Sequence, residues 1–412
     1  MFDVTVIGGG PAGCAAALRA AAGGKRVALV ADGSAGALRL RPVPAPAGAF
    51  SAAVRAAVQA ARRQGAAVQA ALAAAGVRVY VGRGSLLTPG LVGVTRPDMT
   101  IEQILTRAVI LCAGSRPALS EAPGVQEWAA SASPVLWQRR EPPKAAAVLG
   151  SGPAAVELAG FLSACGTPVT LLDLGTDPLP GADPELAAKL IDALVGRGVR
   201  VLESVRVRRL EPGVAEALRL EVSAAGQKRL ALAVDCLLIA GNDRPNVDVA
   251  ELAAVGVAAG PEGIQVDETL ATTAPGIWAA GECTGVPRSH AAAQGAAAAA
   301  ALCGEPTGYD RRAIPECILT EPELAWAGST AGAAAAQGIA VQVADVPLAR
   351  DGVLRLVADP TGRLLGLHGF GPGAAALVTG AAPGLAHGLT WQEIAAAVAA
   401  HMAVAAAVSG PF

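Results

Sequence analysis

Three glycines follow the first apolar run of the chain at a spacing that suits a bound pyrophosphate. Gly8, Gly10 and Gly13 come directly after the apolar residues 4–7, and an alanine-rich helix is expected to begin near Cys14. The first glycine permits a tight turn, the second lets the backbone approach a pyrophosphate, and the third lets helix and strand pack closely. The helix N-terminus offers free N–H groups to the phosphates. The pattern predicts a dinucleotide site, and the alternative is a glycine turn without a ligand.

The chain contains a second glycine turn, which is followed by a carboxylate at the expected distance. Gly150 and Gly152 come after the apolar residues 147–149, and Asp173 lies 23 residues beyond the first of these glycines. A carboxylate at that place accepts hydrogen bonds from both ribose hydroxyls and repels a 2′-phosphate. No arginine lies between Asp173 and Arg197 to bind such a phosphate. The second turn therefore predicts NAD(H) rather than NADP(H).

The first glycine turn departs from this pattern at the end of its second strand, the apolar run expected at residues 27–30 after the helix. Ala31 stands where the ribose carboxylate is expected, and the nearest acid is Asp32, one residue later. The glycines and the apolar runs around them still predict the fold. We expect the contact with the adenosine ribose to be altered, with Asp32 as its candidate.

The composition and the charge exclude several functional classes. The 412 residues carry a net charge of −2 and only 3% are aromatic, so neither a basic surface nor stacking platforms for nucleic acid are expected. The mean hydropathy of +0.46 comes largely from alanine and valine. No uncharged stretch is typical of a membrane-spanning helix, and the first strand begins at once without a leader. We therefore expect a cytoplasmic protein without membrane insertion.

The seven cysteines are dispersed along the sequence. None of them forms a CxxC or CxxxxC pair, and several lie inside apolar runs, which is typical of buried thiols in a reducing compartment. Cys283 is a candidate for a lone redox thiol, and the alternative is a small buried side chain. Because no metal-binding side chains cluster in the sequence, no metal site is predicted.

Apolar runs also precede Gly114, Gly241 and Gly281, and an alanine-rich helix is expected at 290–303. Runs of this kind are typical of buried strands in a parallel sheet. From Tyr309 the pattern changes to alternating strands with helices before and after them, which indicates an α+β domain. The chain is therefore expected to contain two Rossmann-like dinucleotide-binding domains, the second inserted in the first, and a further domain at its C-terminal end.

Five stretches, at 111–117, 179–186, 275–282, 314–325 and 365–372, are together specific for one family. With the two glycine turns they make the chain resemble the flavoprotein pyridine nucleotide–disulfide oxidoreductases, above all the dihydrolipoamide dehydrogenases. The resemblance covers nearly the whole chain and implies FAD, NAD(H) and a homodimer joined through the last domain. The domains that we predict are an FAD-binding domain at 1–116 and 246–308, an NAD(H)-binding domain at 117–245, and an α+β dimerisation domain at 309–412.

The resemblance assigns cofactor contacts to residues along the whole chain. Glu282 replaces the family's aspartate and keeps the carboxylate, so a contact with the ribityl chain of the flavin is expected. Ser289 and His290 match the start of a helix that points N–H groups at the flavin pyrimidine edge and stabilises reduced flavin. Gly241 is a further expected contact, and residues 241–243 read Gly-Asn-Asp where the family has a Thr-Gly-Arg pattern. The other expected contacts are Ala113, Gly114 and Gly281.

Two residues are implied as catalytic by the resemblance. Glu157 matches a family glutamate that lies between nicotinamide and flavin and pairs with a lysine, and we expect Arg39 or Arg41 to replace that lysine. His401 matches the histidine that handles the dithiol protons, but Ala406 stands where its glutamate partner is expected. His401 is therefore either a retained acid–base group or an inherited residue at a dimer interface.

The largest departure from the family follows the second strand. There the family has a CxxxxC disulfide that relays electrons from flavin to substrate, whereas residues 33–50 contain no cysteine. Three prolines at 42–46 stand in its place, and they either shape a substrate pocket or fill the loop. We expect that reduction of lipoamide, glutathione or mercury by the family's mechanism is excluded.

Two functions remain open after this step. The first is an oxidoreductase in which FAD takes hydride from NADH and passes electrons directly to a small-molecule acceptor or a protein partner, or runs in reverse. A quinone, an enone or imine, or oxygen would serve as the acceptor. The second is a non-catalytic homologue that binds nucleotides as a scaffold or sensor.

Overall fold

The computed structural model of the protein describes residues 1–33, 49–118, 120–131, 139, 141–172, 175, 179–214, 217–224, 229–241 and 243–408. At 130–131 and 401–408 only the backbone is described. The described chain forms two compact units. The first unit contains 1–33, 55–118 and 243–309, and the second contains 49–54, 120–241 and 310–408.

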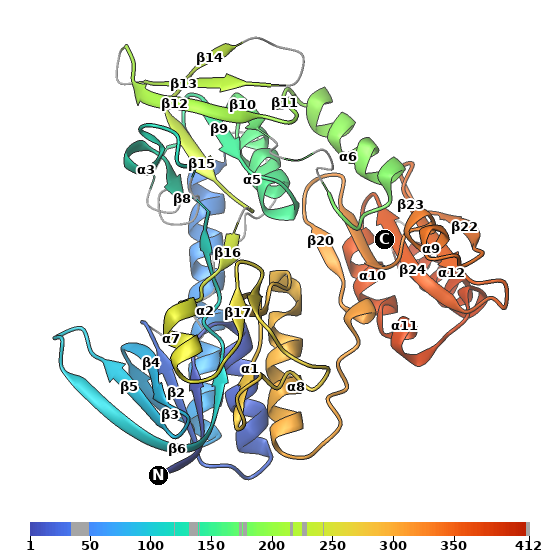
Figure 1. Ribbon diagram of the computed structural model, residues 1–412. Coiled ribbons are helices and arrows are strands. Elements are labelled where there is room, and N and C mark those ends of the chain that lie inside the picture. Colours follow the sequence, from blue (N-terminus) through green and yellow to red (C-terminus); the bar gives the residue numbers. More distant parts are fainter. Residues whose placement is uncertain are drawn as a thin grey trace. The chain divides into compact units, whose positions relative to one another are not determined.

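A mixed sheet forms the core of the first unit (Figure 1). Its parallel strands, in spatial order, are β3 (Arg78–Val81), β2 (Val27–Ala31), β1 (Phe2–Ile7), β6 (Ile101–Leu111) and β19 (Ile277–Ala279). The first half of β6 continues into an antiparallel meander with β5 (Leu91–Thr95) and β4 (Arg83–Thr88). All five residues of β2 are buried, because both faces of the parallel part are covered, and this explains its continuous apolar sequence.

Helices α1 (Pro11–Ala22) and α8 (Ala291–Leu302) pack against each other in the first unit. Small residues make this contact close, because a Cβ added at Gly295 would lie 2.0 Å from the carbonyl oxygen of Ala12. The alanine content of both helices therefore serves packing. The remaining elements of the unit are β7 (Ser115–Pro117), β16 (Asp243–Pro245), α7 (Val249–Ala254), β17 (Ala259–Gly260), β18 (Gly263–Ile264), η1 (Glu282–Thr284) and η2 (Arg288–His290), and most of α2 (Phe50–Ala74) belongs here too.

The structure corrects one helix boundary. The sequence pattern places the start of the first helix near Cys14, whereas α1 begins at Pro11. Proline is favoured in the first turn of a helix, because its missing N–H is one that the helix leaves unbonded and its fixed φ suits the helix.

The second unit contains a parallel sheet with the order β11-β10-β9-β15-β8. The helices of this part are α3 (Val125–Trp128), α5 (Pro153–Ala164) and α6 (Pro184–Gly196). A separate antiparallel sheet consists of β12 (Arg206–Pro212), β13 (Leu218–Ser223) and β14 (Leu230–Val234). The strands of the parallel sheet are β8 (Ala130–Ser131), β9 (Ala146–Leu149), β10 (Val169–Leu172), β11 (Arg200–Leu202) and β15 (Cys236–Ile239).

The C-terminal part of this unit is an antiparallel sheet with the order β20-β21-β24-β23-β22, accompanied by helices. The alternating strands expected after Tyr309 include β22 (Gln342–Pro347), β23 (Val353–Ala358) and β24 (Leu364–Phe370). The other elements are η3 (Arg311–Ala313), β20 (Glu316–Ile318), β21 (Leu324–Gly328), α9 (Ala331–Ala336), α10 (Ala374–Ala381), α11 (Pro383–His387) and α12 (Trp391–Val408). The α+β pattern expected from Tyr309 onward is confirmed.

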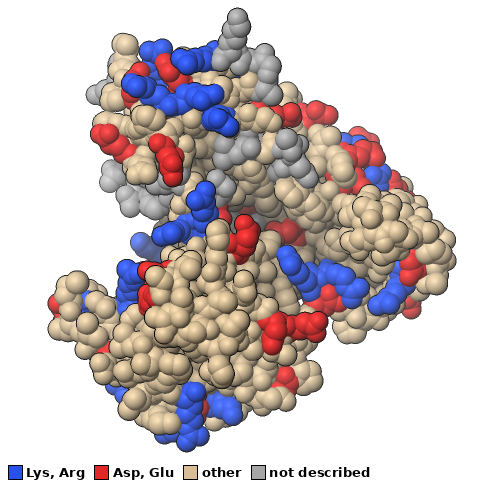
Figure 2. All heavy atoms as spheres, viewed as in Figure 1, with Lys and Arg blue, Asp and Glu red and all other residues tan. Residues whose placement is uncertain are grey.

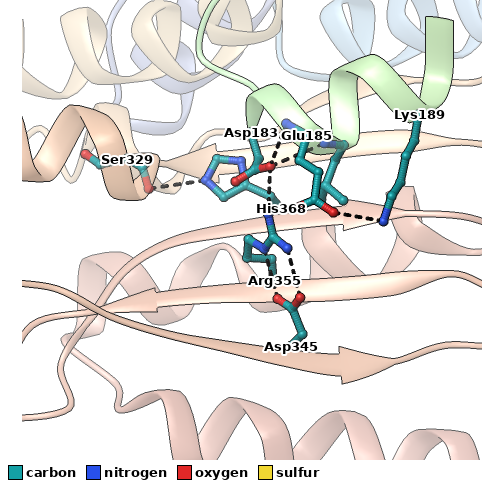
Figure 3. Close-up of polar contacts among 8 residues, drawn as sticks. Asp183, Glu185, Lys189, Ser329, Asp345, Arg355 and His368 are labelled. Atoms are coloured by element: carbon teal, nitrogen blue, oxygen red, sulfur yellow. Dashed lines mark hydrogen bonds and ion pairs between the residues drawn. The ribbon is translucent and has the colours of Figure 1, made fainter. Parts of the chain in front are cut away.

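One arginine joins helix α6 to the C-terminal sheet (Figure 3). Arg355 donates from Nε and Nη2 to Asp345 and from Nη1 to Asp183, each at 2.9 Å, and Nη1 lies 2.9 Å from Oε2 of Glu185. Asp183 also accepts the N–H groups of Glu185 and Leu186 and so caps α6. The Arg355 side chain is 14% exposed. Its hydrogen bonds with Asp345 raise the pKa of Arg355 and lower the pKa of Asp345.

The charges on the surface agree with the near-neutral sequence. On the face drawn in Figure 2, acidic and basic side chains are interspersed in small groups and most of the surface is uncharged. Within the part of the chain that the structure describes, no helix is both long enough and apolar enough to cross a membrane.

Candidate cofactor-binding site

The first glycine turn packs tightly at two of its glycines and leaves room at the third. Gly8 has a φ of +118°, and a Cβ added there would lie 2.0 Å from the carbonyl oxygen of Cys112. A Cβ at Gly13 would lie 1.7 Å from the carbonyl oxygen of Gly8. A Cβ at Gly10 would meet nothing within 4 Å. The turn therefore has open space at the glycine where a pyrophosphate must approach, which fits the FAD that the sequence predicts.

The carboxylate next to this turn lies just beyond its strand. Ala31 is the last residue of β2 and is 2% exposed, whereas Asp32 follows the strand and is exposed to solvent. The ribose contact predicted for Asp32 stays a prediction.

The second glycine turn repeats this geometry in the second unit. A Cβ at Gly150 would lie 1.7 Å from the carbonyl oxygen of Ala240, and a Cβ at Gly241 would lie 2.4 Å from that of Ser151. Gly152 precedes α5 with a φ of +83°, and a Cβ there would meet nothing within 4 Å. Again one glycine faces open space at a helix N-terminus, which fits a dinucleotide phosphate. Asp173, the expected ribose ligand, lies outside the described residues.

A polar cluster surrounds the carboxylate of Glu282 in the first unit. The Ser115 hydroxyl donates to Oε1 of Glu282 at 2.9 Å, and Arg288 Nη2 lies 3.3 Å from the same oxygen. Asp243 adds a second carboxylate, 3.5 Å from the Ser115 hydroxyl and 3.9 Å from Arg288 Nη2. The antiparallel pair of β7 and β16 brings Asp243 to Ser115. Glu282 is therefore held on two sides.

The backbone around Glu282 is fixed by a buried glutamine. Gln294 of α8 accepts the Gly281 N–H at 2.8 Å and the Thr284 hydroxyl at 3.0 Å through Oε1. A Cβ at Gly281 would lie 2.8 Å from the Cβ of Ala12, so this turn contacts the start of α1. The structure thus brings the Gly281–Glu282 turn next to the first glycine turn, at the carboxyl ends of parallel strands, where nucleotides bind in such sheets.

The Ala113–Gly114 turn lies at the same end of the sheet, directly after β6. Asn246 donates from Nδ2 to the carbonyl oxygen of Ala113 at 3.2 Å and from its backbone N–H to that of Gly114 at 2.9 Å. Gly114 has a φ of +70° and open space where a Cβ would lie. The expected cofactor contacts at Ala113 and Gly114 are therefore geometrically possible and stay a prediction.

Ser289 and His290 lie in η2, which leads into α8, as the resemblance implies. His290 is 6% exposed, and its Nδ1 lies 2.9 Å from the hydroxyl of Tyr309, with the two rings in an edge-on arrangement at 78°. One edge of the imidazole is thus occupied by Tyr309. The predicted contact between the N-terminus of α8 and the flavin stays a prediction.

The structure describes the side chain of only one of the two catalytic candidates, Glu157 and His401. Glu157 on α5 is 6% exposed, and its Oε1 accepts the backbone N–H of Leu319 at 2.9 Å. Arg39 and Arg41, its expected partners, lie outside the described residues, so that pairing stays a prediction. The backbone of His401 lies in α12, and its side chain is not described.

All seven cysteines belong to the described residues, and none of them forms a disulfide. Burial raises the pKa of Cys112, and it raises the pKa of Cys283 to about 11. These thiols are protonated at neutral pH, which favours the structural interpretation of Cys283 over a redox one. Within the described ranges, no three acidic, cysteine or histidine side chains form a group that could hold a metal ion.

Sequence reasoning missed Ser115, Arg288, Gln294 and Asn246 as members of this region. Gln294 could have been singled out from the sequence, because it is the one polar residue in an alanine-rich helix. Ser115 and Arg288 could not have been singled out in this way. Their partner Asp243 is distant from Ser115 in the sequence and comes close to it only because β7 pairs with β16.

Comparisons with known proteins give the family. Residues 2–297 match the model of the pyridine nucleotide-disulphide oxidoreductases, and residues 314–409 match the dimerisation domain of the same family. A mercuric reductase of Acidithiobacillus ferrooxidans is 32% identical over 300 residues, which cover 69% of this chain and 54% of that protein. A dihydrolipoyl dehydrogenase of Chlorobaculum tepidum is 29% identical over 451 residues, which cover 97% of this chain and 94% of that protein.

Solved structures show the same fold. The crystal structure of LpdA from Mycobacterium tuberculosis has a TM-score of 0.82 at 25% identity and covers 95% of this chain and 94% of its own. The flavoprotein disulfide reductase RclA from Escherichia coli has a TM-score of 0.80 at 23% identity, over 95% and 94% of the two chains, and this likeness shows the fold alone. The predicted α/β fold class with a C-terminal dimerisation domain is confirmed. The chain belongs to the FAD-dependent pyridine nucleotide–disulphide oxidoreductase family.

Proposed function

We propose that this protein is an FAD-dependent oxidoreductase that uses NAD(H) and exchanges electrons directly between the flavin and a small-molecule or protein partner. FAD would bind at the turn of Gly8, Gly10 and Gly13, with its ribityl chain at Glu282. NAD(H) would bind at the second turn, with Asp173 as its ribose ligand. The observation that carries the proposal is the open space at Gly10 and Gly152, each at the start of a helix that follows a parallel strand.

The proposal includes the absence of a disulfide relay. A relay needs two cysteines close enough to bond, and residues 33–50, where the family has them, contain none. The cysteine next to the Glu282 turn, Cys283, is fully buried and has a pKa raised to about 11, so it is a poor nucleophile toward a substrate. The relatives named as reductases are therefore guides to the cofactors rather than to the substrate.

The roles of the chain's own residues follow from their positions. Bound flavin would supply a two-electron acceptor for the hydride of the nicotinamide. The N-terminus of α8, which begins after Ser289 and His290, would stabilise negative charge on the pyrimidine edge. Glu157 would border the nicotinamide, with its carboxylate oriented by the Leu319 N–H. His401 is proposed as an acid–base group for the electron acceptor.

We also propose an oligomeric state, a cellular compartment and classes of electron acceptor. The match of 314–409 to a dimerisation domain supports a homodimer, and seven cysteines without a disulfide among them favour a reducing compartment such as the cytoplasm. We propose that the FAD-binding domain comprises residues 1–116 and 246–308, the NAD(H)-binding domain residues 117–245 and the dimerisation domain residues 309–412. A quinone, an enone or imine, or oxygen is proposed as acceptor.

Three replacements favour a second candidate, a nucleotide-binding scaffold or sensor without turnover. Ala31 lacks the ribose carboxylate, Asp243 stands in a pattern where the family has arginine, and Ala406 lacks the carboxylate that would orient His401. Each replacement weakens a contact to a cofactor or to a proton acceptor.

A spectrum and one titration separate these two candidates. The purified protein is expected to show a flavin absorption spectrum, directly or after incubation with FAD, and anaerobic NADH is expected to bleach it. A flavin spectrum that NADH leaves unchanged favours the sensor. A protein that remains colourless after incubation with FAD contradicts the proposed enzyme.

A further inference from the structure

Two carboxylates and one guanidinium lie together beside the proposed flavin site. Arg288 Nη2 is 3.3 Å from Oε1 of Glu282 and 3.9 Å from Oδ2 of Asp243, so one arginine lies within ion-pair distance of both acids. The two acidic side chains are 17% and 22% exposed, and that of Arg288 is 42% exposed. The cluster is therefore partly buried. Charges interact more strongly in such a place than they do in water.

The hydroxyl between the acids does not satisfy both of them. Ser115 lies 2.9 Å from the Glu282 carboxylate and 3.5 Å from that of Asp243, and a hydroxyl has a single proton to donate. Two carboxylates that share one hydroxyl repel each other. Arg288 lies within ion-pair distance of both acids and offsets part of this repulsion.

The position of the cluster makes its charge important for a ligand. Glu282 follows Gly281, whose added Cβ would lie 2.8 Å from Ala12 at the start of α1. The open space at Gly10 lies in the same glycine turn. An anionic diphosphate bound there would meet the field of the two acids, and an uncompensated pair would repel it.

We propose that Arg288 is a positioning residue for FAD. It offsets part of the negative charge of Glu282 and Asp243 so that the diphosphate can bind nearby, and it holds the Glu282 carboxylate in the orientation that accepts the ribityl hydroxyls. Asp243 stands in a pattern where the family has arginine, so Arg288 supplies a positive charge that this chain lacks at 243. This inference rests on the proposed binding of FAD.

The test measures FAD affinity rather than turnover. FAD is titrated into the flavin-free full-length protein, and binding is followed by the change in flavin fluorescence. Arg288→Gln is expected to weaken binding about three- to tenfold, because it removes a half-exposed ion pair and leaves two like charges together. The double variant R288Q/D243N is expected to recover most of the loss, since it removes one of the repelling charges. A merely structural role for Arg288 predicts no such rescue.

Arg107, on the main sheet of the first unit, provides a matched control. Arg107 lies on β6, 3.9 Å from Asp3 at the start of β1, and its side chain is 67% exposed. Arg107→Gln removes the same charge and is expected to change FAD affinity by less than about twofold. The loss in R288Q is also expected to shrink at high salt, because the repulsion acts through partly solvated charges.

The outcomes distinguish this inference from the proposed function. If the unaltered protein binds no FAD, both are contradicted. If the unaltered protein binds FAD and R288Q binds it equally well, the inference alone is wrong. If R288Q binds FAD more weakly and the double variant R288Q/D243N does not recover the affinity, the inference that Arg288 acts by offsetting charge is wrong.

Discussion

Arg355 and Arg288 each face more than one carboxylate, but they differ in burial and geometry. Arg355 in the second unit is 14% exposed, whereas Arg288 in the first is 42% exposed. Arg355 makes a bidentate pair with Asp345 and reaches the cap of α6 through Asp183, with every distance at 2.9 Å (Figure 3). The ion pairs of Arg288 are longer, at 3.3 and 3.9 Å.

This difference separates a structural role from a binding role. Arg355 has its donors directed at protein groups in two secondary-structure elements, so its removal would leave the mostly buried Asp183 without a cation. Arg288 is half exposed and pairs with Glu282, which follows a turn that contacts the start of α1, so we expect its loss to affect FAD binding more than stability. The comparison predicts that stability and cofactor affinity can be changed independently.

The largest effect is expected at the first glycine turn. Gly13→Ala would place a Cβ 1.7 Å from the carbonyl oxygen of Gly8, and we expect it to destabilise the first unit by about 3 kcal/mol or more. Gly10→Ala is the matched control, because Gly10 has a φ of −76° and open space at its Cβ. It should fold normally and bind FAD weakly. Urea unfolding and FAD titration measure the two effects, and equal unfolding curves for both variants would contradict this account.

The next largest effect is expected at Arg355. Arg355→Met should lower the free energy of unfolding of the second unit by about 2–3 kcal/mol, because it leaves three carboxylates without their shared cation. FAD affinity should stay within about twofold, since the cluster lies outside the proposed FAD site. Arg355→Lys keeps the charge but not the bidentate geometry, and it should recover part of the loss. A fall in FAD affinity without loss of stability would remove the distinction between the two arginines.

A smaller effect is expected from pH. The pKa of Asp345 is lowered from 3.8 in the folded protein by its hydrogen bonds to Arg355, so its stabilising contribution is fully present above about pH 4. The contribution is lost as pH falls through the lowered folded-state pKa. The difference in unfolding free energy between the unaltered protein and R355M should therefore be constant from neutral pH to about pH 5 and shrink below about pH 4. A difference that grows on acidification would show that Asp345 is not the partner that matters.

Local patterns predicted the parts of the fold that depend on neighbours in sequence. The last four residues of β1 and all four residues of β9 are buried, and all of them except Thr5 are apolar, so both strands can be recognised directly in the sequence. The glycine turns have few alternatives, because at Gly8 and Gly150 an added side chain would meet a backbone oxygen at 2.0 Å or less.

The polar surroundings of the site depend on distant pairings. Ser115 meets Asp243 across 128 positions of sequence, and the contact exists only because β7 pairs with β16. The contact between His290 and Tyr309 likewise depends on the return of the chain after α8. Such contacts have no period or spacing that a sequence shows. Asp173, Arg39, Arg41 and the side chain of His401 lie outside what the structure describes, and their roles stay predictions.

The most direct test of the central claim is the number of electrons that the flavin-loaded protein accepts. Anaerobic titration with dithionite, followed by flavin absorbance, is expected to end at two electrons per FAD, because the flavin is then the only two-electron acceptor. A protein with a disulfide relay would take up four electrons per FAD, two in the flavin and two in the disulfide. An end point at four would contradict the claim that this chain transfers electrons without a thiol relay.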